Sequence, residues 1–312
     1  TRPEMILEAV SSLQWNYSQV LVMPNLTPTH IVNAAQVEVY RKKLQKFLPV
    51  GVHPLMTISL KPETTIQDIR DCSWKIAAVK YYPGWVTTNS GKTTGDINPD
   101  DTNTRWILET LEECDIVLSL HPETTVTRNT HGMITKGFVH RAEREFASIV
   151  EKIATNHPKL KIVIEHLSTK EMVELIKWRK YPNLWWTVTP QHLLCTAHDK
   201  EWGHAFETHL HCKPTLKDPE DLLAIQELVY SGNPKVFFGS DSAPHSQDTK
   251  ECAHCASGVF SSPIAIQIIV DWWMSPNTDT WWKNLSGQHL SDDDKIMRLQ
   301  NFFADNGECL YG

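Results

Sequence analysis

The feature that most constrains the fold is an alternation of short apolar runs with longer amphipathic stretches along the chain of 312 residues. Seven β-branched or apolar runs predict strands: Gln19–Met23, Pro54–Leu60, Ile76–Tyr81, Asp115–Leu120, Lys161–Glu165, Leu184–Val188 and Lys235–Gly239. The stretches between them predict helices: Ile31–Phe47, Thr104–Glu113, Val139–Ala154, Lys170–Trp178, Pro219–Tyr230 and Pro263–Trp273. Strands that alternate with helices in this way predict a parallel sheet of the α/β class.

Seven strands with no clear reversal favour an incomplete (β/α)8 TIM barrel over a Rossmann sheet, because the chain has no GxGxxG motif. A doubly wound sheet is the structural alternative. We expect a single barrel domain over residues 1–312, since neither a linker nor a repeat interrupts the pattern. The net charge of −7 argues against a nucleic-acid partner. No apolar run approaches the roughly 20 residues that span a bilayer, so we expect no membrane partner.

The cysteines and three unusual segments have simple structural interpretations. Seven scattered cysteines indicate free thiols in a reducing compartment, and hence a cytoplasmic location. Cys252 and Cys255 flank His254 as in a zinc ribbon, but no second CxxC completes four ligands, so we interpret them as part of a loop. His209-Leu210-His211 is interpreted as a loop too. The four paired tryptophans of Asp271–Asn284 favour helix packing.

Four side chains that can carry chemistry end predicted strands, where barrel enzymes build their active sites. They are Lys80, His121, His166 and Asp241, each after a buried apolar run. Any one of them alone is explained by a structural hydrogen bond or ion pair. Together, in this order, they match a two-metal hydrolase, because imidazole and carboxylate suit Zn²⁺. A lysine binds metal only after CO₂ has converted its amine to a carbamate.

Seven ordered motifs are similar to those of the short, monofunctional dihydroorotases of the amidohydrolase superfamily. The motifs are Val22-Met23-Pro24-Asn25-Leu26-Thr27-Pro28, Lys80-Tyr81-Tyr82-Pro83, Thr87-Thr88-Asn89-Ser90, Leu120-His121-Pro122-Glu123, Glu165-His166, Thr189-Pro190-Gln191-His192-Leu193 and Gly239-Ser240-Asp241-Ser242-Ala243-Pro244-His245. The similarity extends from about Met5 to Gly312. It implies a zinc-dependent hydrolase that reversibly cyclises N-carbamoyl-L-aspartate to L-dihydroorotate in pyrimidine biosynthesis. The resemblance also allows a homodimer.

The resemblance implies two Zn²⁺ per full-length subunit, bridged by carbamylated Lys80 and a hydroxide. His121 and His166 would bind the second zinc, and Asp241 would bind the first and act as general base and acid. The residues that would hold the substrate are Asn25 and His245 at its α-carboxylate, Thr87 and Thr88 on a closing loop, and Lys213 and Ser257 through backbone groups at the ring.

The chain departs from the family pattern at its two ends. The family carries His-x-His and an arginine at the end of the first strand, whereas this sequence begins at Thr1-Arg2-Pro3, just after that motif. We therefore expect the first barrel strand, with two ligands of the first zinc, to be missing, and the C-terminus to stop early. Two alternatives stay open: another cyclic amidohydrolase, of the dihydropyrimidinase or allantoinase type, and a non-catalytic dihydroorotase-like protein.

Overall fold

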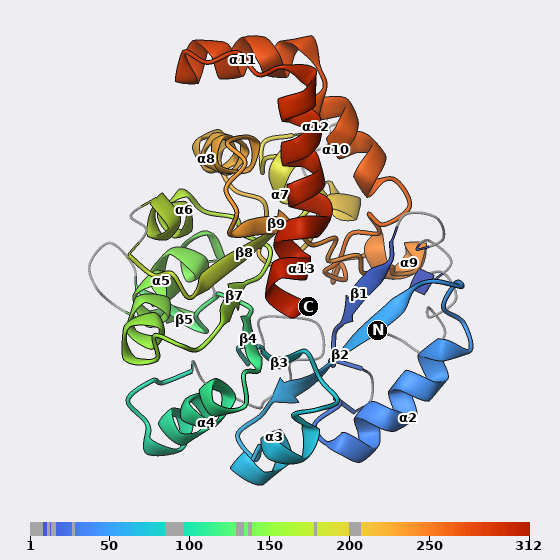
Figure 1. Cartoon of the computed structure of the whole chain (residues 1–312), viewed down its shortest axis with the longest axis vertical. Coiled ribbons are helices and arrows are strands. Elements are labelled where there is room, and N and C mark those ends of the chain that lie inside the picture. Colours follow the sequence, from blue (N-terminus) through green and yellow to red (C-terminus); the bar gives the residue numbers. More distant parts are fainter. Residues whose placement is uncertain are drawn as a thin grey trace.

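The protein folds around one curled sheet of parallel strands with helices on its outer side (Figure 1). The structure is a computed structural model that describes residues 9–10, 13, 17–26, 29–84, 97–128, 134–136, 139–177, 180–199 and 207–312. The strands, in their order across the sheet, are β1 (Gln19–Val22), β2 (His53–Leu60), β3 (Ala78–Tyr81), β4 (Val117–Leu120), β7 (Ile162–Ile164), β8 (Leu184–Val188) and β9 (Val236–Phe238). All seven predicted strands are confirmed, and every pair of neighbours is parallel.

Helices follow the strands as the alternation predicts. They are α2 (Ala34–Gln45), α3 (Ile66–Cys72), α4 (Thr102–Glu113), α5 (Val139–Asn156), α6 (Lys170–Lys177), α7 (Pro190–Leu194), α8 (Pro219–Tyr230), α9 (Gln247–Lys250), α10 (Ala265–Trp273), α11 (Pro276–Ser286), α12 (Asp292–Gln300) and α13 (Asn306–Tyr311). A π-helical turn, η3 (Asn301–Asp305), joins α12 to α13, and a 3-10 turn, η2 (Thr208–Leu210), precedes α8. A small antiparallel hairpin of β5 (Val126–Arg128) and β6 (Ile134–Lys136) lies between β4 and α5. No helix of the described residues combines the length and apolar character needed to cross a membrane.

The strands bury both faces, and alternate residues pack into two separate cores. Outward-facing residues such as Val79, Leu118 and Ile162 join one large core with the surrounding helices. The inward-facing residues form a second, smaller group, which we call the floor cluster: Ala78, Val117, Val163, Phe237 and Leu310. This separation is what a period of two residues produces when a sheet curls on itself.

The floor cluster is completed by a residue from outside the sheet. Leu310 belongs to α13, which lies beside the strands near the centre of the molecule (Figure 1). The side-chain amide of Asn306 fixes the start of α13 by donating to the carbonyl oxygens of Asn233 and Val236, at 3.2 and 2.8 Å. Because Ala78 and Val117 are the first residues of their strands, the floor cluster lies at the N-terminal end of the barrel.

Two residues further along each strand, the inward-facing positions change from apolar to polar. The polar residues are Lys80, Ser119, Glu165 and Thr187, and Gly239 takes the corresponding position after β9. Gly239 leaves room for the neighbouring strand, because a Cβ at this position would lie 2.9 Å from Cβ of Thr187. The barrel interior therefore has an apolar floor and a polar layer that opens at the C-terminal ends of the strands, here called the mouth.

The tryptophan-rich segment packs as helices, as the sequence predicts. The ring of Tyr230, in α8, lies between 4.9 and 6.2 Å from four indole rings, those of Trp272, Trp273, Trp281 and Trp282. Its hydroxyl donates to Asp279 at 2.9 Å. This aromatic cluster joins α8, α10 and α11 on the outside of the sheet, away from the mouth.

Candidate active site

The four predicted metal ligands lie at the mouth of the barrel. Lys80 is inside β3, His121 follows β4 directly, His166 lies two residues after β7, and Asp241 lies three residues after β9. The first three are buried, whereas Asp241 is accessible from the open mouth. Parallel strands point their carboxyl ends the same way, so these residues come from one edge of the sheet.

The same residues are close neighbours in space. The imidazole rings of His121 and His166 are 4.5 Å apart between centroids. Lys80 is close enough to both rings and to Asp241 to change their pKa values by its charge. In the described part of the chain, no three His, Cys, Asp or Glu side chains form a metal cluster by themselves. Lys80 is the neighbour that the two imidazoles and the carboxylate share.

Two of these four residues have a rare backbone conformation. His166 has a φ of 44° and Asp241 a φ of 43°, in the left-handed region that costs energy for residues with a Cβ. Each lies where the chain turns away from the sheet after its strand. The backbone of His166 is held in this turn by Thr187, whose hydroxyl accepts a hydrogen bond from the His166 N–H at 2.8 Å. Such strain persists only where the surroundings enforce it, as they do at functional sites.

Glu123 fixes the orientation of His121. Its Oε2 lies 2.7 Å from Nε2 of His121, and both side chains are buried. When Nε2 carries the proton and donates to the carboxylate, Nδ1 keeps a lone pair for a cation. Burial opposes ionisation of Glu123, but His121, Lys217 and Lys213 together outweigh this effect and lower its pKa. The His121–Glu123 pair thus has the form of a metal-binding histidine with its supporting carboxylate.

Burial also sets the protonation of the other groups. It lowers the pKa of Lys80, against the opposing effect of Glu165 and Asp241, and so favours the neutral amine that reacts with CO₂. It lowers the pKa values of His121 and His166, which favours neutral imidazoles with a lone pair that can bind a cation. Asp241 is accessible at the mouth, yet the protein around its carboxylate desolvates it and, together with the charge of Glu165, raises its pKa to about 7 against the effect of Lys80.

Glu165 connects three strands beneath the mouth. One carboxylate oxygen accepts a hydrogen bond from Ser119 of β4 at 2.5 Å, and the other accepts one from Thr187 of β8 at 2.7 Å. Because Thr187 also binds the backbone of His166, this network ties the polar layer of the barrel to a predicted ligand. The sequence motif Glu165-His166 contains this residue, but its role became visible only in the structure.

The predicted substrate residues that the structure describes lie around the same mouth. Asn25 follows β1, and Lys213 is near enough to His121 to lower its pKa by charge. His245 contacts the backbone carbonyl of Ser257 through Nε2, at 3.0 Å. Thr87 and Thr88 lie outside the described residues.

Two buried charged residues at this mouth have no signal in the sequence alone. Glu143 of α5 accepts hydrogen bonds from the backbone N–H groups of Ser168 and Thr169, in the turn that follows His166. Lys250 of α9 donates to three backbone carbonyls of the loops that contain Lys213 and Ser257. Their partners are distant in sequence, so only the fold identifies them.

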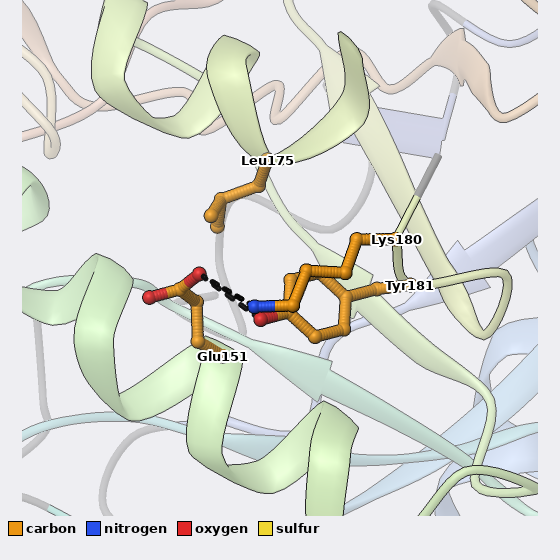
Figure 2. A pocket seen from close by; sticks show the side chains of 4 residues that line it. All are labelled: Glu151, Leu175, Lys180 and Tyr181. Atoms are coloured by element: carbon orange, nitrogen blue, oxygen red, sulfur yellow. Dashed lines mark hydrogen bonds and ion pairs between the residues drawn. The ribbon is translucent and has the colours of Figure 1, made fainter. Parts of the chain in front are cut away.

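The remaining histidine and cysteine motifs agree with the structural interpretations that the sequence favours. His209 forms an ion pair with Glu251 at 2.9 Å on the surface, and no metal cluster of the described residues includes Cys252 or Cys255. All seven cysteines are free thiols, as expected. Figure 2 shows a pocket on the helical side of the barrel, in which Lys180 and Tyr181 face Glu151. It contains none of the predicted ligands.

The fold and the position of the site define the class of protein. A curled parallel sheet with its polar residues at the C-terminal mouth is the arrangement of the (β/α)8-barrel enzymes. L-hydantoinase (dihydropyrimidinase) from Arthrobacter aurescens has the same fold, with a TM-score of 0.75 over 99% of this chain and 66% of that one. At 15% sequence identity this likeness shows the fold alone.

Comparison within this class identifies the family. No family model matches the chain. A dihydroorotase from Acinetobacter baylyi is 32% identical over 308 residues, which cover 97% of this chain and 80% of that protein. The crystal structure of dihydroorotase from Saccharomyces cerevisiae, in complex with 5-fluoroorotic acid, superposes with a TM-score of 0.83 at 28% identity and covers 99% of this chain and 81% of that one. The chain belongs to the dihydroorotase family.

Proposed function

We propose that the protein is a dihydroorotase that reversibly closes N-carbamoyl-L-aspartate into L-dihydroorotate, a step of pyrimidine biosynthesis. The observation that carries this proposal is the gathering of Lys80, His121, His166 and Asp241 at one mouth, in a chain of the dihydroorotase family. The reaction breaks or forms one cyclic amide C–N bond, with water consumed in the hydrolytic direction. We further propose that residues 1–312 form a single barrel domain that acts on small molecules in the cytoplasm, consistent with seven free thiols.

The donor set fits two zinc ions. Glu123 leaves Nδ1 of His121 for a cation, and Nδ1 of His166 is buried without a hydrogen-bond partner among the described residues. Lys80 would join as a carbamate, formed when its neutral amine adds CO₂ and releases a proton, and would bridge the two ions. Asp241 would contribute a carboxylate oxygen. Bound zinc supplies a Lewis acid and a water molecule of lowered pKa.

The residues of the chain would then manage binding and proton transfer. Asp241 would accept a proton from the attacking water and return it to the ring nitrogen as the C–N bond breaks. Asn25 and His245 would hold the α-carboxylate of the substrate, and backbone groups at Lys213 and Ser257 would hold the ring. Thr87 and Thr88 are proposed to belong to a loop that closes over the substrate.

Turnover of competing substrates tests this proposal. The purified full-length protein, supplied with zinc and bicarbonate, is expected to hydrolyse L-dihydroorotate much faster than dihydrouracil or allantoin. Preference for dihydrouracil or allantoin would assign a different cyclic amidohydrolase, and no turnover by a folded, zinc-loaded protein would favour the non-catalytic alternative. Metal analysis is expected to give about two zinc ions per full-length chain, and light scattering on the same sample tests the homodimer.

A further inference from the structure

Lys250 is a buried lysine whose ammonium group, within the described part of the chain, hydrogen-bonds to backbone carbonyls and to no carboxylate. Only 4% of the residue is exposed, and its ammonium group donates to the carbonyl oxygens of His211, Ala256 and Gly258 at 3.1, 2.9 and 2.8 Å. An ammonium group has three N–H donors, so these contacts use all of them. Among the described residues, no salt bridge of Lys250 accompanies them. A buried charge is costly unless it is fully hydrogen-bonded, so these three contacts define what the side chain does.

The three carbonyls come from two loops that also contact each other directly. His211 lies in the segment before Lys213, whereas Ala256 and Gly258 flank Ser257. The Gly258 N–H donates to the His211 carbonyl at 2.9 Å, and the Ser257 hydroxyl lies 3.1 Å from Nε2 of His211. Lys250 adds three hydrogen bonds to these contacts and connects both loops.

The second of these loops packs directly against the segment that follows Asp241. A Cβ at Gly258 would lie 2.7 Å from Cβ of Ala243 and 3.0 Å from Cδ2 of His245. The Ala243 N–H donates to the Val259 carbonyl at 2.9 Å, and Nε2 of His245 contacts the Ser257 carbonyl at 3.0 Å. This packing leaves no free space, so a displacement of the loop displaces Ala243 and His245 with it.

We propose that Lys250 is a positioning residue, which holds the backbone around Lys213 and Ser257 in register with His245 so that together they bind the substrate. The inference rests on the proposed function, because it assigns those groups to substrate binding. Lys250 does not touch the substrate. Its loss should therefore weaken binding in the ground state and the transition state alike, which raises KM and leaves kcat nearly unchanged.

The test compares Lys250→Met with Lys295→Met in the full-length, zinc-loaded protein. Methionine keeps an unbranched side chain but removes the ammonium group. Lys295 is a matched control because it is equally buried, at 4% exposure, and its ammonium group pairs with Asp279 and Asp292 beside the aromatic cluster. Both variants lose a buried charge and should lose stability, so stability alone does not distinguish the positioning role.

Two readouts do distinguish it. In Lys250→Met, KM for L-dihydroorotate is expected to rise at least about tenfold with kcat changed less than about threefold and zinc content unchanged. The backbone N–H groups of Ala243, Ala256 and Gly258 are expected to exchange hydrogen faster than in wild type. In Lys295→Met, KM and the exchange of these three groups should match wild type.

An unchanged KM in Lys250→Met, with wild-type turnover intact, would reject the positioning role while leaving the proposed function in place. Equal rises of KM in both lysine variants would reject it too, because a general loss of stability would then explain the effect. If the wild-type protein does not turn over dihydroorotate, the proposed function is rejected instead. The role of Lys250 in substrate binding is then rejected as well, because it rests on that function.

Discussion

His166 and Asp241 show how much of this site depends on single residues held in unfavourable states. Both have a positive φ, and His121 and Glu123 form a buried hydrogen-bonded pair. The two positive φ values cost backbone energy, so the surrounding structure must enforce them. The chemistry of the site thus depends on side chains that the rest of the fold forces into place.

Substitution of Asp241 tests its proposed role as the general base. Asp241→Asn keeps the shape and tolerates the left-handed backbone, but it removes the proton acceptor. We expect kcat to fall by about 10²–10⁴-fold. Asp115→Asn is the matched control, because Asp115 has a φ of 55° and forms only a surface ion pair with Lys161. Steady-state kinetics should show wild-type kcat for Asp115→Asn, and a comparable loss in both variants would contradict the assignment.

Glu123→Gln tests the supporting role of the carboxylate at His121. Glutamine removes the charge and can present an N–H group to Nε2, which would favour the other tautomer of the imidazole. Zinc affinity is expected to fall by about 10–100-fold, measured by competition with a chelator. The control is Glu112→Gln, since Glu112 faces His157 at 4.0 Å, outside the mouth. Wild-type zinc affinity in Glu123→Gln would count against a metal-binding role for His121.

Among the elements, the sequence predicted those with strong local signals. The start of α8 was correct to the residue because Asp218 and Pro219 mark it, and β8 matched at both ends. The missed helices are short, although Thr65 begins α3 and Ser291 begins α12 with a capping box. These two capping boxes are the sequence signals that could have predicted α3 and α12, because neither helix has a long periodic pattern of apolar residues.

The residues of the candidate site also divide into those that the sequence predicted and those that only the structure identified. Lys80, His121, His166 and Asp241 end strands, so local pattern and family resemblance place them together. The partners of Glu143 and Lys250 lie in other elements, between 6 and 39 residues away. No local periodicity encodes such contacts, because they exist only once the elements have packed.

Glu143 gives a pH-dependent prediction for α5. Burial raises its pKa from 4.5 to about 7, against the opposing effects of Lys217 and of the hydrogen bonds from Ser168. A raised carboxyl pKa favours the protonated native state, so this contribution to stability is fully present below pH 4.5 and is lost as the pH rises through about 7. The melting temperature should fall less steeply over this range in Glu143→Gln than in wild type.

The comparison for Glu143 uses the slope of melting temperature against pH, so that a uniform loss of stability in the variant does not affect it. Glu151→Gln, on the same helix, is the control, since 44% of its side chain is exposed beside Lys180. We expect it to retain the wild-type slope. A wild-type slope in Glu143→Gln as well would show that Glu143 does not titrate differently in the folded and unfolded protein.

At the scale of the whole molecule, the barrel interior depends on a helix that is not part of the repeating pattern. The first halves of the strands enclose the floor cluster, and Leu310 of α13 completes it. The alternation of strands and helices predicts the barrel, but it does not predict what fills its N-terminal end. The floor cluster thus groups α13 with strands as distant in sequence as β3, more than half the chain away.

Leu310→Ala tests this packing. Leu310 is 5% exposed, and its truncation would leave a cavity among Ala78, Val117, Val163 and Phe237. The free energy of unfolding is expected to fall by about 2–5 kcal/mol, measured by denaturant titration. Leu285→Ala, at a leucine that is 52% exposed, should change it by less than about 0.5 kcal/mol. Equal effects of the two substitutions would mean that α13 does not contribute to the core.

The floor cluster also affects how small molecules can reach the barrel interior. Its apolar side chains are almost completely excluded from solvent, so the floor cluster itself offers no path for water or an anion. On the proposed function, reactant and product would then both pass through the mouth at the opposite end of the barrel. Accumulated product would compete with incoming reactant for this passage, in whichever direction the reaction runs.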